Sequence, residues 1–213
     1  ITALTEQNTR GVSGIFEIPL NFVIKQINCC LSDIGANAIK IGMMHNAELI
    51  NGVYEALKQN EIIGNKKIKI VLDPVMVAKG GHRLLKEDAV NSLLNFIKNT
   101  NPVLTPNIPE AEILTKIKIK SITDMKNAAK ILLDLGAKNV LIKGGHLSSK
   151  NLKDIFVNKK ETAIFVNKKI DTKNTHGTGC TLSSAIATYY GCGKTLKKSC
   201  ELGIRYVNNA IKT

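Results

Sequence analysis

Short apolar runs alternate with segments of helical periodicity along most of the chain, and this alternation constrains the fold more than any other feature. Runs rich in isoleucine, valine and leucine predict buried strands at 38–42, 69–72, 102–105 and 139–143. Apolar residues spaced three and four apart predict helices at 19–34, 47–59, 86–98, from about 109, 123–135, 180–190 and 195–211. Two alternating runs, 153–157 and 162–167, predict a hairpin.

Buried strands that alternate with helices are typical of a mostly parallel sheet covered on both faces. We therefore expect an α/β fold with three layers, formed as a single domain over residues 1–213. Ligands of such sheets bind beyond the carboxyl ends of the strands. The candidate site residues are those that directly follow a strand, at 42–44, 73–76, 105–107 and 143–146, together with a turn at 177–180.

The turn Gly177-Thr178-Gly179 leads directly into the predicted helix 180–190. The first turn of a helix presents unpaired N–H groups and a partial positive charge, so it attracts anions. Glycines at 177 and 179 let the backbone approach a phosphate without a Cβ in the way. A tight structural connection explains the same residues about equally well, so the turn alone does not decide between these interpretations.

Composition indicates a protein of the cytoplasm. The chain has 213 residues, of which 44% are hydrophobic, enough to bury a full core. No apolar run is long enough to cross a bilayer and no leader opens the chain, so we expect no membrane partner. The cysteines are odd in number and lack Cys-x-x-Cys spacing, which predicts reduced thiols: Cys29, Cys30, Cys180, Cys192 and Cys200.

A net charge of +13 raises the alternative of a nucleic-acid binder. The lysines are scattered, however, and aromatic residues make up only 4% of the chain, whereas single-strand binding depends on exposed aromatic side chains. A genome poor in G and C, which favours lysine codons, explains the net charge better than a nucleic-acid-binding surface does. We therefore expect no nucleic-acid partner.

Six segments, in this order along the chain, resemble the hydroxymethylpyrimidine and phosphomethylpyrimidine kinase family of thiamine biosynthesis, within the ribokinase-like superfamily. These segments are 5–9, 40–43, 73–78, 105–112, 143–146 and 174–182. The chain opens on an apolar run without methionine and ends while helical periodicity continues. The resemblance implies a piece of a longer protein, without about forty N-terminal residues and a short C-terminal end.

The resemblance implies two transfers of the γ-phosphoryl group of ATP, with Mg²⁺ as cofactor. The first acceptor is the hydroxymethyl oxygen of 4-amino-5-hydroxymethyl-2-methylpyrimidine, and the second is the resulting monophosphate. The expected partners are this small pyrimidine, ATP and a second copy of the chain in a homodimer. The alternatives are a pyridoxal or pyridoxine kinase of the same fold and a catalytically inactive binding remnant.

The resemblance also implies the substrate-binding residues. The Gln7 amide offers an acceptor and donors to the edge of an aminopyrimidine. Met43 would form a polarisable wall for the ring, although a core methionine is nearly as plausible. Val75 would line the same pocket.

Four further residues are assigned to the phosphates and the metal. Lys143 would neutralise transferred charge, and Asp73 would position the nucleotide or metal-bound waters. Asn107 and Glu110 resemble a motif that holds Mg²⁺ through waters, but the same spacing is a helix capping box. Both interpretations of that pair stay open.

Cys180 stands where most ribokinase-like enzymes have an aspartate that acts as general base. A thiol at a helix N-terminus is expected to have a lowered pKa and could accept a proton. We hypothesise that a residue that can be neutral also tolerates the second acceptor, because a phosphate monoester is largely dianionic and would be repelled by a fixed carboxylate.

Overall fold

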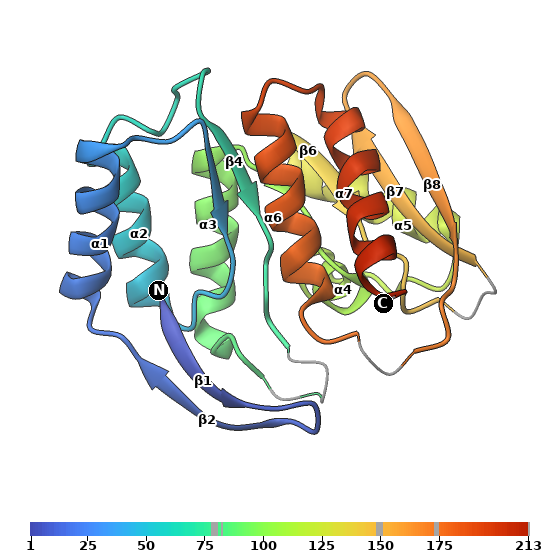
Figure 1. Cartoon of the computed structure of the whole chain (residues 1–213), viewed down its shortest axis with the longest axis horizontal. Helices are drawn as coiled ribbons and strands as arrows, with labels where there is room; N and C mark the ends of the chain where they lie inside the picture. Colours follow the sequence, from blue (N-terminus) through green and yellow to red (C-terminus); the bar gives the residue numbers. More distant parts are fainter. Residues whose placement is uncertain (78–80, 82, 148–150, 173–174, 213) are drawn as a thin grey trace.

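The structure is a computed structural model that describes residues 1–77, 81, 83–147, 151–172 and 175–212. Its centre is a six-stranded sheet with the strand order β3-β4-β5-β6-β7-β8 (Figure 1). Four parallel strands come first, followed by two antiparallel ones: β3 (Ala38–Ile41), β4 (Lys69–Leu72), β5 (Val103–Leu104), β6 (Asn139–Ile142), β7 (Asn151–Asn158) and β8 (Thr162–Lys168). The predicted strands and the predicted hairpin are all present, which confirms the α/β class.

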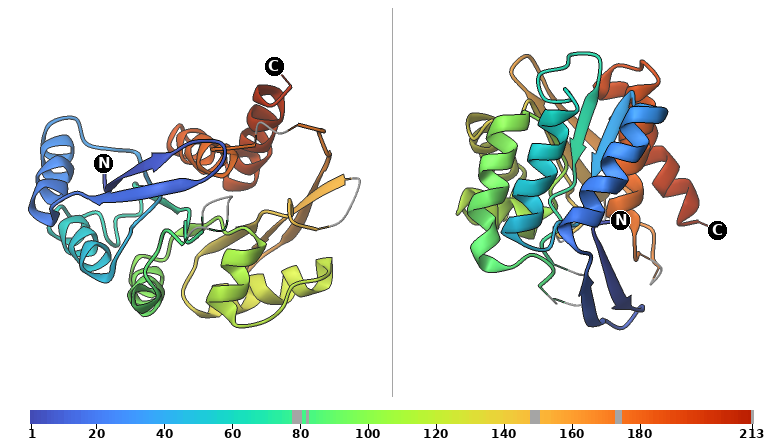
Figure 2. Two further views of the ribbon diagram at one scale, coloured as in Figure 1. Left: turned by 90° about the horizontal axis from the view of Figure 1, so that it is seen from below. Right: turned by 90° about the vertical axis from the view of Figure 1, so that its left-hand side faces the viewer.

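Helices cover both faces of this sheet, as the left view of Figure 2 shows. Because the parallel strands follow one another in chain order, right-handed crossovers place their connecting helices on the same face. That face carries α2 (Ala47–Gln59), α3 (Val90–Thr100), α4 (Ile108–Thr115) and α5 (Ile122–Asp134), with α1 (Leu20–Asp33) packed beside α2. The other face is covered by α6 (Thr178–Gly191) and α7 (Leu196–Ala210).

The core is divided between the two faces by the alternation of side chains along each strand. On β4, Val71 packs in the cluster with α6 and α7, whereas Leu72 packs in the larger cluster on the other face. Strands buried on both faces are mostly apolar. For this reason the parallel strands could be recognised in the sequence by their apolar residues, although Lys40 interrupts the run in β3.

A separate hairpin of β1 (Ala3–Gln7) and β2 (Val12–Glu17) projects from the edge of the molecule at which the parallel strands end (Figures 1 and 2). The sequence indicated only an apolar run at the start of the chain, so β2 and the hairpin were missed. Its strands carry weak alternation and exposed apolar side chains, including Leu4 and Phe16, because they cover no core of their own. The Glu17 carboxylate lies 2.8 Å from Lys86 Nζ and 3.3 Å from His45 Nε2, and these contacts join the hairpin to the main body.

The helices match their predicted ranges within about two residues, with one difference in form. The predicted helix 86–98 begins as a 3₁₀ turn, η1 (Glu87–Ala89), and α3 continues to Thr100. Within the described ranges, no helix combines the length and the apolar character that a bilayer span requires.

Candidate active site

The carboxyl ends of the parallel strands β4, β5 and β6 and the N-terminus of α6 lie at the same edge of the sheet, the lower one in Figure 1. A β-bridge between Asn107 and Lys143 extends the pairing of β5 and β6 beyond the ends of both strands. This bridge places the residues that follow β5 next to those that follow β6. Residues predicted separately from four stretches of sequence are thereby brought to one place.

Asp73 and Lys143 form a buried ion pair at the centre of this edge. Lys143 Nζ lies 2.7 Å from Asp73 Oδ1, and the Asp73 side chain is 1% exposed. The Thr105 hydroxyl donates to Asp73 Oδ1 (3.2 Å), and the Ser183 hydroxyl donates to Asp73 Oδ2 (3.2 Å). Both carboxylate oxygens are therefore fixed by β5, β6 and α6, as a buried charge requires.

The carboxylates around Lys143 keep its ammonium group in the charged form. Burial acts to lower the pKa of its ammonium, but the negative charges of Asp73 and Glu110 outweigh burial and raise the pKa. Its Nζ lies 3.2 Å from where a Cβ at Gly179 would stand. A permanent positive charge therefore sits directly under the first turn of α6.

Asn107 and Glu110 form the capping box that their spacing predicted. The Asn107 side chain accepts from the Glu110 N–H (2.9 Å), and Glu110 Oε2 accepts from the Asn107 N–H (2.8 Å). Glu110 is 3% exposed. Burial, together with the nearby charge of Asp73, raises its pKa to about 7, against the opposing influence of Lys143 and of the N–H groups of Asn107 and Met76.

The N-terminus of α6 has no such cap. Gly177, the residue before the helix, adopts a left-handed φ of +76° and makes no side-chain cap. The Thr178 hydroxyl donates to the Thr175 carbonyl (2.9 Å), and the first intrahelical bond is donated by Thr181 to Gly177 (2.9 Å). Within the described parts of the chain, the N–H groups of residues 178–180 have no hydrogen-bond partner. They are available to an anion.

The pKa of Cys180 was wrongly predicted. Cys180 lies in the first turn of α6, and the residue as a whole is exposed. Nevertheless, the protein around the thiol removes enough water to raise its pKa, and Asp73 adds to this effect, whereas Lys40 and Lys143 oppose it. Burial outweighs the charges of both lysines, and the thiol is neutral near pH 7.

The three predicted substrate residues lie on three different segments at the same edge. Gln7 ends β1 at an irregularity of the hairpin, and its Oε1 accepts from the Thr5 hydroxyl (3.3 Å). Met43 is half-buried after β3, and its carbonyl accepts from the Thr2 hydroxyl (2.6 Å). Val75 is half-buried, and its N–H donates to the Asp73 carbonyl (2.8 Å). Among the described residues, no hydrogen bond joins Gln7 to Met43 or Val75.

Three site residues received no role from the sequence. Thr105 and Ser183 are fully buried and hold Asp73. Ser183 follows Gly179 by four residues, so a helical projection places both on the same face of α6. The third is Lys40 of β3, whose Nζ lies 2.5 Å from where a Cβ at Gly42 would stand. Ala78 and Asn174, which belong to the motifs, lie outside the described residues.

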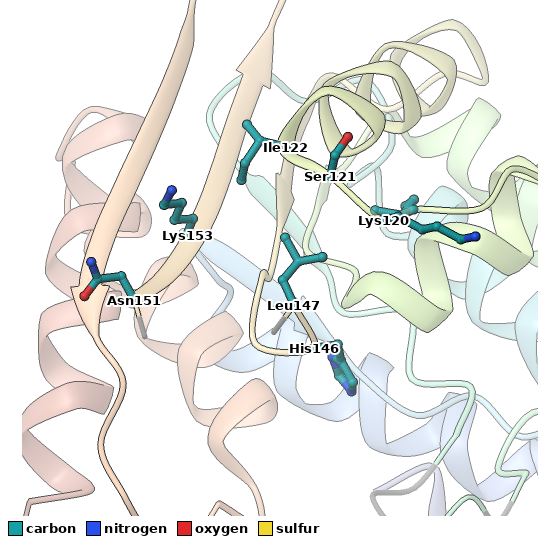
Figure 3. Close-up of a pocket in the computed structure, with 8 residues that line it drawn as sticks. Lys120, Ser121, Ile122, His146, Leu147, Asn151 and Lys153 are labelled. Atoms are coloured by element: carbon teal, nitrogen blue, oxygen red, sulfur yellow. The ribbon is translucent and has the colours of Figure 1, made fainter. Parts of the chain in front are cut away.

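A surface pocket of about 420 Å³ opens next to this site, between the α4–α5 connection and the β6–β7 connection. Figure 3 shows His146 and Leu147 from the loop after β6, and Asn151 and Lys153 from the start of β7. Burial and the charge of Lys143 lower the pKa of His146. Of the candidate positions predicted from the sequence, only His146 lines this pocket, and none of the residues assigned to the substrate, the phosphates or the metal does.

The family follows from a match along the whole chain. Residues 1–213 match the family model described as phosphomethylpyrimidine kinase. The chain belongs to this family. A hydroxymethylpyrimidine/phosphomethylpyrimidine kinase of Aquifex aeolicus is 43% identical over 213 residues, which cover 100% of this chain and 81% of that protein. The thiamine biosynthesis bifunctional protein ThiED of Geobacter sulfurreducens is 45% identical over 212 residues, and the chain spans 42% of its length.

Solved structures agree with the observed architecture. A phosphomethylpyrimidine kinase from Clostridium difficile has a TM-score of 0.83 at 39% identity, over 99% of this chain and 84% of that one. A Staphylococcus aureus pyridoxal kinase in complex with AMP-PCP and pyridoxal has a TM-score of 0.87 at 29% identity, over 100% of this chain and 76% of that one. The predicted ribokinase-like, three-layer α/β fold is confirmed.

Proposed function

We propose that this chain is an ATP-dependent kinase that phosphorylates 4-amino-5-hydroxymethyl-2-methylpyrimidine and then its monophosphate, in thiamine biosynthesis. The observation that carries the proposal is the uncapped N-terminus of α6 directly above the buried Lys143–Asp73 pair. Membership of the phosphomethylpyrimidine kinase family supports the choice of substrate. Phosphoryl transfer requires positioning and charge compensation, which this arrangement can provide.

The migrating phosphoryl group is held by the turn before α6. The N–H groups of Thr178, Gly179 and Cys180 point from an uncapped helix start and can bind its oxygens, and Gly177 gives the turn its left-handed geometry. Lys143 adds a full positive charge on the sheet side of the same group. Asp73 keeps that ammonium in place and charged. Gly179 leaves room for the phosphate because its missing side chain would face Lys143.

Mg²⁺ fits the donor chemistry of this edge. The carboxylates of Asp73 and Glu110 are hard oxygen ligands, and the raised pKa of Glu110 indicates a buried carboxyl that lacks sufficient positive charge. Within the described residues, no three acidic, histidine or cysteine side chains form a cage for a metal, which suits an ion that binds through one or two carboxylates, waters and substrate phosphates. The ion would neutralise charge on the ATP phosphates when bound. Glu110 would hold its waters while also capping α4, and Asn107 would fix Glu110 in that position.

Cys180 acts as a neutral residue next to the reacting oxygen. With its pKa raised, the thiol does not repel a dianionic monophosphate, which supports the hypothesis that cysteine suits the second transfer. It is correspondingly a weak base for the first transfer. A Cys180→Asp variant should therefore slow the second transfer more than the first, and equal rates for both transfers would contradict this role.

The pyrimidine ring is placed between the hairpin and the ends of β3 and β4. Gln7 binds the amino edge of the ring, and Met43 and Val75 contact its faces. The half-buried state of all three residues is compatible with contact to a small ligand.

Pyridoxal kinase is the second candidate, because Staphylococcus aureus pyridoxal kinases match the fold with TM-scores of 0.84 to 0.87. Their identities of 29 to 32% are lower than the 37 to 45% of the first three curated relatives, which are named for pyrimidine phosphorylation or thiamine biosynthesis. The deciding experiment measures ADP release with the hydroxymethylpyrimidine, its monophosphate and pyridoxal as acceptors. We expect kcat/KM to be highest for the two pyrimidines. Faster turnover of pyridoxal would overturn the assignment, and binding of pyrimidine and ATP without turnover would indicate an inactive remnant.

The proposed setting is the cytoplasm, with a homodimer as the assembly. All five cysteines are free thiols, which supports a reducing compartment. Sedimentation of the purified protein tests the dimer.

A further inference from the structure

Lys40 is a second lysine at the active edge, and its role differs from that of Lys143. It lies on β3 in register with Val71 of β4, which packs against α6 and α7. Ala38, two residues earlier on the same face of β3, contacts the far end of α6, where a Cβ at Gly191 would lie 2.9 Å from Ala38 Cβ. Lys40 therefore faces α6 and stands nearer to its N-terminus.

The side chain of Lys40 extends along β3 toward the carboxyl edge of the sheet. Its Nζ lies over Gly42, 2.5 Å from where a Cβ would be built. Gly42 immediately precedes Met43, which the proposed function places against the pyrimidine ring. The electrostatic influence of Lys40 also reaches the Cys180 thiol. The Lys40 ammonium thus lies between the acceptor side of the site and the first turn of α6.

The two lysines differ in their partners. Lys143 forms an ion pair with Asp73, at 2.7 Å. Lys40 is half-buried and forms no ion pair with any carboxylate in the described ranges. A partly buried ammonium without a counterion favours the binding of an anion at its position.

We propose that Lys40 binds the phosphate of the acceptor in the second transfer and so determines the affinity for the monophosphate over the alcohol. This inference rests on the proposed function. In the first transfer the acceptor is a neutral alcohol, and Lys40 has no anion of the acceptor to bind. In the second, an oxygen of the monophosphate attacks the γ-phosphorus of ATP, the bond to the β-phosphate oxygen breaks, and ADP leaves. The acceptor phosphate then lies beside the migrating group, on the side of Gly42, Met43 and Lys40.

The test compares Lys40→Met with the wild type on both acceptors. A charge-assisted hydrogen bond lost to the monophosphate should raise its KM about ten- to a hundredfold, and its dissociation constant in a titration without ATP by a similar factor. The KM values for the alcohol and for ATP should stay within about twofold, because neither ligand uses this charge in the proposal. Lys40→Arg should retain most of the monophosphate affinity, since it keeps the positive charge.

The matched control is Lys69→Met. Lys69 lies on β4 in register with Ala38, at the opposite end of the sheet, where its Nζ stacks over the Tyr190 ring at 5.4 Å. The Lys69→Met substitution removes one positive charge from the same face of the sheet. The KM values of both acceptors should therefore change equally and only slightly. If Lys69→Met weakens the binding of the monophosphate as much as Lys40→Met does, a general charge effect is responsible and the proposal fails.

Other outcomes also decide. If Lys40→Met weakens the binding of the alcohol and of the monophosphate equally, or weakens only the binding of ATP, the assignment of Lys40 to the acceptor phosphate is overturned. If Lys40→Met does not fold, Lys40→Gln serves for the same comparison, and failure of both to fold would show that the charge serves the fold instead. The proposed function fails separately, if the wild type phosphorylates neither pyrimidine.

Discussion

Two helices begin at the same edge of the sheet, and their N-termini are built in opposite ways. The start of α4 is closed by its own residues, because Asn107 and Glu110 each accept a backbone N–H of the other. The start of α6 is open, because Gly177 has no side chain and residues 178–180 find no acceptor in the described chain. Both termini lie near Lys143, so the difference does not come from their electrostatic surroundings.

The difference shows how a fold can separate stability from ligand binding. A side-chain cap contributes about 1 kcal/mol to a helix. The α4 terminus gains this stabilisation and leaves few donors for a ligand. The α6 terminus forgoes it, and its free N–H groups can bind a phosphate. The helix that we propose binds the phosphate is therefore the one whose local sequence stabilises it less.

The largest expected effect comes from removing the positive charge of Lys143, which lies near the N-termini of both α4 and α6. Lys143→Met should lower kcat on the order of 10²–10³-fold, because the positive charge next to the migrating phosphoryl group is lost. It should also lower the free energy of unfolding by about 3–5 kcal/mol, because Asp73 is left buried and unpaired. Steady-state kinetics and urea denaturation measure the two effects.

The double variant Asp73→Asn, Lys143→Met separates these effects. Without the unpaired carboxylate, most of the stability should return, whereas kcat should stay low. Recovery of activity in the double variant would show that Lys143 serves only to balance Asp73.

The closed terminus should show a distinctive pH dependence. The pKa of Glu110 is raised to about 7 in the folded protein from 4.5. Between these values the folded state holds a proton that the unfolded state releases, so the contribution of Glu110 to stability falls as pH rises, by roughly 3 kcal/mol in total. Urea denaturation between pH 4.5 and 8 should show this slope in the wild type and not in Glu110→Gln, which can still accept from the Asn107 N–H.

The exposed capping box of α5 provides the control of opposite sign. The Ser121 hydroxyl and N–H, with the Lys120 N–H, donate to Asp124 and lower its pKa. Its contribution is present at neutral pH and is lost as the pH falls below the ordinary aspartate pKa, so its slope is measured by urea denaturation at pH values below those used for Glu110. Asp124→Asn should therefore remove stability at pH 7 and leave activity unchanged. If Glu110 and Asp124 gave slopes of the same sign, the burial of Glu110 would not be the cause of its pKa shift.

The smallest expected effect concerns the geometry of the open terminus. Gly177 and Gly193 have left-handed φ values of +76° and +82°, and a Cβ at either would meet no atom within 4 Å. Gly177→Ala and Gly193→Ala should therefore cost a similar free energy of unfolding, about 1 kcal/mol. Only Gly177→Ala should also lower kcat/KM for ATP, by about tenfold, because it shifts the phosphate-binding N–H groups. Equal kinetics of the two variants would show that the turn does not position the phosphate.

The sequence was most informative where the local pattern coincides with the fold. The strand 139–142 and the helix 47–59 were readable because each is long or apolar enough to show its periodicity. The capping box of Asn107 and Glu110 was also readable, because both partners lie within one helical turn. Asp73 and Lys143 were correctly placed at strand ends, but their ion pair joins residues 70 positions apart and no local pattern reports it.

Other features could not be read from the sequence for physical reasons. Ser183 is an ordinary small helical residue until α6 packs on β4 and directs its hydroxyl to Asp73. The pKa of Cys180 was predicted with the wrong sign, because the effect of a helix terminus is local whereas burial depends on every element around the thiol. The hairpin of β1 and β2 was missed because it has no core to impose a strong alternation.

The sequence by itself determined the strands of the main sheet, the helices, and the short motifs that indicate the family, because each of these follows from residues close together in the chain. Only the tertiary structure decided which charges meet. It paired Lys143 with Asp73, left Lys40 without a counterion in the described ranges, and buried Glu110 enough to raise its pKa. Charge pairing and desolvation depend on distances through space, which are set only when the parallel strands align their carboxyl ends at one edge.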